Sequence, residues 1–201
     1  MGRIRGSLRL LLLAALLAAA APLRAAAPGP QEVIRASNQA VLALLRQHPT
    51  VDDATERSLF ALIDPVTDFA GMAEAATGSF CAKLTAAECS LFRETFTRLL
   101  RVSSIKKLGR YRADSFDYLG EERTAGTAVV RTLAHHKAEK VPLDYQLALR
   151  GERWLIVNYV VDEVDTIRNY RKQFTRLFQQ ESFAQVIDRL RAKIASYEAE
   201  R

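Results

Sequence analysis

The spacing of apolar residues changes abruptly near Gly109, and this change limits the choice of fold. Before this glycine, apolar residues recur every three or four positions, which is typical of helices that bury one face. Between residues 113 and 161 they alternate in steps of two and include many β-branched and aromatic side chains, which is typical of strands. After residue 165 the helical spacing returns. We therefore expect an α+β fold, with helices both before and after a run of strands.

Four strands are predicted, at Ala113–Leu119, Gly126–His135, Lys140–Arg150 and Arg153–Val161. The two residues Gly151 and Glu152 between the last two strands predict a tight antiparallel hairpin. On the third strand, alternate positions place Leu143, Tyr145 and Leu147 on one apolar side. Such a face needs a cover, so we expect helices to gather on one face of a curved antiparallel sheet.

Six helices are predicted, at about 31–47, 55–63, 67–76, 86–108, 166–179 and 183–198. Thr85 and Glu88 have the spacing of a capping box at the start of the long fourth helix. Asp165 and Ser182 are suited to cap the last two helices. We see neither an internal repeat nor a second domain, so one domain is expected over residues 26–201.

The first 25 residues have the composition of a secretory signal peptide. A short cationic start is followed by twelve apolar residues from Leu10 to Ala21, then by Pro22 and a small residue at Ala25. The apolar run is shorter than the roughly 18–20 residues that cross a membrane. We expect a signal peptide at residues 1–25 and export of the rest, with an uncleaved anchor as the alternative.

Net charge gives no reason to expect a nucleic-acid partner. Four of the 29 Lys and Arg residues lie within the first 25 positions, which contain no Asp or Glu. The remaining chain has 25 basic and 23 acidic residues, so its net charge is close to zero.

The two cysteines, Cys81 and Cys89, do not have the spacing of a zinc site. In an oxidising compartment they can form a disulfide, and two small buried thiols are the alternative. His135 and His136 are adjacent on a predicted strand, so they point to opposite faces and cannot bind one metal together. No nucleophile elbow, phosphate-binding loop or dinucleotide-binding motif is present. We therefore expect no catalytic residues, no metal site and no cofactor, and hence a protein that is not an enzyme.

The segment from Trp154 to Phe174 resembles the signature of the MlaC family, also called the toluene-tolerance auxiliary proteins. In that family a strand that begins with Trp leads through a turn into a helix containing Asn-Tyr-Arg-x-x-Phe. The matching residues here are Asn169, Tyr170, Arg171 and Phe174. The order of elements agrees from about residue 30 to residue 197. The chain departs from the family at Asn158, Glu163 and Asp165, where Asp, Gly and Ser are usual, and the usual Gly indicates a positive φ at position 163.

The resemblance implies a periplasmic carrier of phospholipid. Such a protein moves a diacyl lipid between an outer-membrane lipoprotein complex and an inner-membrane ABC transporter complex with its periplasmic substrate-binding subunit, and so maintains outer-membrane asymmetry. It also implies a cone-shaped fold like that of nuclear transport factor 2, with the lipid as cargo in a pocket between sheet and helices. The candidate lipid-binding residues are Phe92, Phe96, Leu99, Leu100, Leu143, Tyr145, Leu147, Tyr170, Phe174 and Phe178.

A cationic run on the fourth helix is a candidate docking or headgroup surface, with Arg98, Arg101, Lys106 and Lys107 as its residues. Three alternatives stay open. Each candidate pocket residue can instead belong to an ordinary core. The cargo can be a different lipid, such as a hopanoid. The protein can also be a periplasmic interaction module that binds no ligand.

Overall fold

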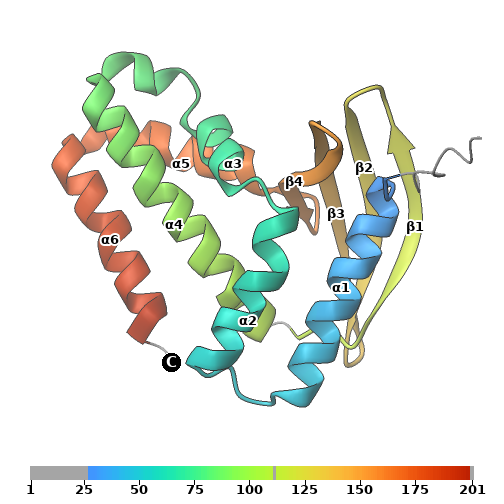
Figure 1. The fold of residues 1–201 in the computed structure, drawn as a ribbon. Helices are drawn as coiled ribbons and strands as arrows, with labels where there is room; N and C mark the ends of the chain where they lie inside the picture. The colour runs from blue at the N-terminus through green and yellow to red at the C-terminus, as the bar shows by residue number, and fades with distance from the viewer. Residues whose placement is uncertain (1–26, 111, 200–201) are drawn as a thin grey trace, which may run out of the picture.

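The computed structural model describes residues 27–110 and 112–199, so the predicted signal peptide lies outside the described residues. The chain runs through helices, then a sheet, then two more helices (Figure 1). The α-helices are α1 (Pro30–Gln47), α2 (Asp53–Ile63), α3 (Phe69–Thr77), α4 (Ala86–Arg110), α5 (Thr166–Gln180) and α6 (Phe183–Ala199). Two 3-10 segments, η1 (Asp64–Val66) and η2 (Gly78–Lys83), flank α3. The strands are β1 (Ser115–Arg123), β2 (Thr127–His136), β3 (Glu139–Arg150), β4 (Arg153–Val161) and β5 (Val164–Asp165).

The sheet is an antiparallel meander in the order β1-β2-β3-β4-β5, which confirms the predicted α+β fold. Arg150 pairs with Arg153 across the hairpin, as the sequence predicts. The first strand begins two residues after its predicted start and extends four residues beyond its predicted end, across a bulge at Leu119 that shifts the register between Tyr118 and Gly120. The fifth strand was not predicted, since two residues carry no periodicity.

The caps were predicted correctly. The backbone N–H of Glu88 donates to the Thr85 hydroxyl at 3.2 Å, and the Glu88 carboxylate accepts from the Thr85 backbone at 2.9 Å. The Asp165 carboxylate accepts from the backbone of Arg168 at 2.8 Å, which caps α5. Side-chain oxygens at these positions satisfy N–H groups that a helix start leaves without partners.

The first half of α1 covers the middle of the sheet, while α3 and α5 contact the sheet mainly at β4, so the helices share the sheet face unevenly. Ile34 is fully buried against strand residues that share one sheet face. This sheet cluster consists of Ile34, Ala128, Val130, Tyr145, Leu147, Trp154 and Ile156. Figure 1 shows α1 lying along the sheet, between the strands and α2.

The remaining helices form a layer of their own around α4, which packs against α2, α3 and α6 (Figure 1). Because neighbours surround α4, it buries residues on more than one side rather than along a single stripe. Its members Phe92 and Phe96 are fully buried. We call the set around them the helical cluster; it includes Val41 and Leu45 from the second half of α1, as well as residues of α2 to α6.

The two layers meet along β4. Thr67, between η1 and α3, forms a parallel bridge with Ile156, and the backbone of Asp68 donates to the Ile156 carbonyl at 2.9 Å. Helix α5 follows directly after β5 and packs against β4. No described helix is long and apolar enough to cross a membrane.

Candidate functional site

The seven candidate pocket residues on helices lie together in the helical cluster. The Phe174 ring lies 4.9 Å from that of Phe92 and 4.7 Å from that of Phe96, edge to face. The Tyr170 ring lies 4.9 Å from Phe96. Aromatic rings at these distances fill the space between helices. Leu99, Leu100 and Phe178 belong to or pack against the same cluster.

The three candidate residues on β3 lie in or against the sheet cluster instead. Tyr145 and Leu147 are buried, and the half-buried Leu143 packs at the margin of the cluster. The structure therefore divides the ten predicted residues between two apolar clusters, and the helix residues do not face the strand residues directly.

Uncharged polar groups mark the boundary between the two clusters. The Tyr145 hydroxyl donates to the Asn38 amide oxygen at 3.0 Å, and Asn38 lies on α1 between the halves that face each cluster. The hydroxyls of Thr67 and Tyr159 are 3.4 Å apart, which is a long and therefore weak contact. We call Asn38, Thr67, Tyr145 and Tyr159 the interlayer seam.

Tyr159 packs against both clusters, and sequence reasoning missed it. Its ring lies 5.8 Å from that of Tyr145, edge to face. A second bulge explains the miss. Gln146 pairs with Asn158 but Leu147 pairs with Ile156, so Val157 is an extra residue that breaks the simple alternation along β4. Burial raises the pKa of both Tyr145 and Tyr159 above the ordinary tyrosine value, so the seam stays uncharged.

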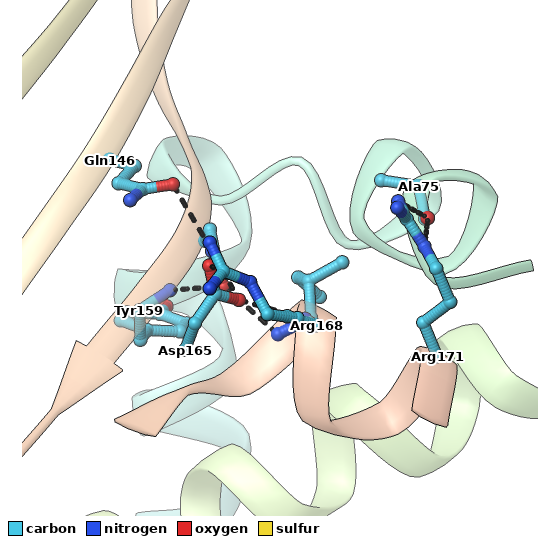
Figure 2. A network of polar contacts seen from close by, with 8 residues as sticks. Ala75, Gln146, Tyr159, Asp165, Arg168 and Arg171 are labelled. Carbon is cyan, nitrogen blue, oxygen red and sulfur yellow. Dashed lines mark hydrogen bonds and ion pairs between the residues drawn. The ribbon is translucent and has the colours of Figure 1, made fainter. Parts of the chain in front are cut away.

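Asn158 joins the sheet to the start of α5, and Figure 2 labels two of its partners, Gln146 and Asp165. Its amide nitrogen donates to the Gln146 side chain at 3.1 Å and to the Asp165 carboxylate at 2.9 Å. Its amide oxygen accepts from the backbone of Ile167 at 3.1 Å, in the first turn of α5. This buried side chain fixes where the helical layer leaves the sheet, and we call it the β4–α5 joint.

Comparison with known proteins gives the family. The sequence matches the family model described as MlaC protein over residues 35–192. The chain belongs to the MlaC family. Its fold is similar to the solved structure of a phospholipid-binding protein from Ralstonia solanacearum, determined in complex with a phospholipid. The TM-score is 0.71 at 20% identity, over 85% of this chain and 99% of that chain, so this likeness concerns the fold alone. A search of curated proteins gives no match.

The turn that departs from the MlaC pattern does have the expected backbone. Asp162 and Glu163 have φ of 47° and 63°, and Val161 pairs with Val164 around them. Two positive values in a two-residue loop are the signature of a type I′ turn. The left-handed conformation costs a residue with a side chain about 1–2 kcal/mol, which a glycine avoids. This MlaC family protein therefore carries two strained residues, Asp162 and Glu163, beside the β4–α5 joint.

The MlaC motif arginine has a structural role here. Arg171 donates from its guanidinium to the carbonyl of Ala75, at the end of α3, as Figure 2 shows. This contact satisfies a carbonyl that a helix end leaves without a partner. It also ties α5 to α3 within the helical layer.

Two of the four candidate docking cations have carboxylate partners on other elements. Arg98 pairs with Glu198 of α6 at 2.7 Å. Arg101 holds Asp64 through two nitrogens and lies 3.8 Å from the centre of the Phe60 ring, which braces α4 against α2. Lys106 is half-buried and Lys107 is exposed. Two of the four predicted cations therefore link helices.

A disulfide joins Cys81 of η2 to Cys89 in the first turns of α4, with their Cα atoms 5.4 Å apart. This outcome is the first of the two alternatives that the sequence left open. The neighbouring Phe80 packs its ring against Phe92 and Phe178 at 5.3 and 4.8 Å. The disulfide therefore holds one side of the helical cluster closed.

A pocket with charged walls begins next to the seam, because Asp68 directly follows Thr67. This pocket of about 800 Å³ is lined by Asp68, Ala70, Gly71, Glu74, Arg93, Glu94, Thr97 and Arg150. Charges of both signs make it unsuited to acyl chains. The two adjacent histidines bind different partners, His135 the Asp117 carboxylate and His136 the carbonyl of Arg112. Among the described residues, no group of three or more His, Cys, Asp or Glu is placed to hold a metal ion.

Proposed function

We propose that this protein binds a diacyl phospholipid between its two layers and carries it across the periplasm. The lipid would pass between an outer-membrane lipoprotein complex and an inner-membrane ABC transporter complex with its substrate-binding subunit. The observation that carries the proposal is the match to the MlaC family over residues 35–192. The similar fold of a protein solved in complex with a phospholipid supports it.

The division into two apolar clusters supports a site at the interlayer seam. Separating the layers there breaks the contacts of Tyr159 and the backbone bridge between Thr67 and Ile156, but leaves each cluster packed on its own side. Each buried methylene contributes about 0.8 kcal/mol. Ten methylenes thus supply about 8 kcal/mol, which corresponds to micromolar binding before the cost of separating the layers. Two long acyl chains leave a surplus to meet that cost.

The chemistry of the seam favours a cargo held by its chains rather than by its headgroup. The hydroxyls of Thr67, Tyr145 and Tyr159 and the amide of Asn38 carry no charge with which to hold a phosphate. The headgroup would remain in water. The protein is then expected to accept lipids with different headgroups.

Two further features support export to the periplasm. The first 25 residues have the order of a signal peptide. The Cys81–Cys89 disulfide fits an oxidising compartment.

Native mass spectrometry is the most direct test. The chain from Ala26 is produced in a bacterial periplasm, purified without detergent, weighed intact and then extracted with organic solvent. One diacyl phospholipid per protein is the expected result. A polycyclic lipid in the extract would change the cargo to the hopanoid alternative. An empty protein that takes up nothing from phospholipid vesicles would refute carriage and favour a protein-interaction role.

A matched pair of tryptophan variants tests the position of the site. Leu143→Trp adds a ring beside the seam, on the same sheet face as Tyr145, and we expect it to lower the lipid-bound fraction at least about tenfold. Leu133→Trp is the control, because Leu133 is also half-buried but lies on the opposite face of the neighbouring strand. Circular dichroism checks that both variants fold. Equal loading of the two folded variants would place the lipid elsewhere.

A further inference from the structure

Helix α5 has an unusual distribution of charge. Its sequence from Thr166 to Gln180 contains four basic residues and no Asp or Glu, whereas each of the other five described α-helices contains at least one acid. The guanidinium of Arg171 donates a hydrogen bond to the carbonyl of Ala75 on α3. The other three cations recur at every fourth residue and are all exposed: Arg168, Lys172 and Arg176.

We call Arg168, Lys172 and Arg176 the α5 basic stripe. Residues four apart lie on the same side of a helix, and a rise of about 1.5 Å per residue makes the stripe about 12 Å long. Arg168 has only a loose contact with Asp165, 3.9 Å away, and its side chain is 72% exposed. Within the described part of the chain, Lys172 and Arg176 form no ion pair with a carboxylate. Three cations in a row repel one another unless an anion binds beside them and compensates their charge.

The position of the stripe links it to the seam. Helix α5 begins at the β4–α5 joint, where Asn158 binds both Asp165 and the backbone of Ile167. The opposite side of α5 buries Ile167 and Phe174 in the helical cluster. A molecule bound to the stripe therefore lies beside the place where the two layers meet.

We propose that the α5 basic stripe is a docking surface for an acidic protein partner, one that presents carboxylates at the spacing of one helical turn. Such charge complementarity speeds encounter and fixes register. The exposed acids Asp162 and Glu163 stand just before the stripe, so the partner is expected to carry a cation at that end. This proposal does not depend on lipid binding.

An anionic membrane surface fits this face less well. A helix that lies on a membrane inserts apolar side chains beside its basic face. The apolar side of α5 is not available for insertion, because Phe174 is only 2% exposed and packs against Phe92 and Phe96. The acids at the start of the stripe would also be repelled by anionic headgroups.

A designed peptide supplies the test. The probe is a fluorescein-labelled, alanine-rich helix with three glutamates spaced four residues apart, and the protein is the full exported chain with whatever lipid it carries. We expect the double variant Lys172→Glu/Arg176→Glu to bind this peptide at least about tenfold more weakly than the unaltered protein, by fluorescence anisotropy at low salt. The control Arg57→Glu/Lys140→Glu makes the same change in net charge at exposed sites on α2 and β3, and its affinity should stay within about twofold.

A charge exchange completes the experiment. A peptide with lysines in place of the glutamates should bind the α5 double variant at least about tenfold better than it binds the unaltered protein. Equal losses in the α5 and control variants would overturn the proposal, because net charge alone would then explain binding. Stripe-dependent sedimentation with vesicles containing about 30% phosphatidylglycerol, without peptide binding, would also overturn it and assign the surface to a membrane. Native mass spectrometry of each variant reports lipid content separately, so failure of lipid carriage is distinguishable from failure of docking.

Discussion

Replacing Asn158 by alanine tests whether this one side chain holds the helical layer to the sheet. Asn158 is 6% exposed and makes three hydrogen bonds to other elements: to Gln146 on β3, to Asp165 before α5 and from Ile167 in α5. A buried hydrogen bond contributes about 1 kcal/mol net. The variant also leaves the Ile167 N–H without a partner in the interior, which adds to the loss. We expect Asn158→Ala to lower the free energy of unfolding by roughly 3 kcal/mol.

Urea unfolding followed by circular dichroism measures this loss directly. For a domain of 150–250 residues, roughly 3 kcal/mol corresponds to a melting temperature lower by about 6–12 °C. Gln146→Ala is the matched control, because it removes a single bond of the same joint and should cost about 1 kcal/mol. A loss below about 1 kcal/mol for Asn158→Ala would refute the reasoning, since the joint would then contribute no more than an ordinary surface contact.

Substitutions at two other residues, Glu163 and Tyr145, allow independent predictions of stability. Glu163→Gly should raise the free energy of unfolding by about 0.5–1 kcal/mol, because relief of the positive φ outweighs the added freedom of the unfolded chain; unchanged or lower stability in urea would contradict this. Burial raises the pKa of Tyr145, so its contribution to stability is present below the unfolded value near 10 and is lost as the pH rises further. Tyr145→Phe should therefore lower stability at pH 7 by about 1 kcal/mol, through the lost bond to Asn38, yet flatten the decline above about pH 10. An equally steep alkaline decline in this variant would show that Tyr145 does not cause it.

Local signals explain what the sequence could predict. The capping pair Thr85 and Glu88, the Asp165 cap and the hairpin at Gly151 each depend on residues that are close in the chain, and all three appear in the structure. The bulges at Leu119 and Val157 were missed, because nothing in the alternating pattern marks an extra residue.

The periodicity of apolar residues also does not show which element a buried side chain packs against. Phe96 and Leu147 both lie on apolar stripes, and both are buried as predicted. The stripe of Phe96 packs against other helices, however, whereas that of Leu147 packs against α1. Which stripe meets which depends on contacts between distant parts of the chain. The seam between the clusters, and Tyr159 within it, therefore emerged only from the structure.

The departures from the MlaC pattern at positions 158 and 165 compensate each other, because the two side chains share one hydrogen bond. The family resemblance implies Asp and Ser at these positions, a pair in which a hydroxyl would donate to a carboxylate; here the Asn158 amide donates to the Asp165 carboxylate at 2.9 Å. The donor and the acceptor have thus exchanged positions. Both side chains still accept hydrogen bonds from backbone N–H groups in the first turn of α5. Asn158→Asp alone would bring two carboxylates together in a buried site, and we expect it to destabilise the protein by about 2–3 kcal/mol. Asn158→Asp/Asp165→Ser should recover most of that loss, and urea unfolding of the two single variants and the double variant gives the coupling energy. Additive losses would show that the two positions act independently and that the exchange is not compensatory.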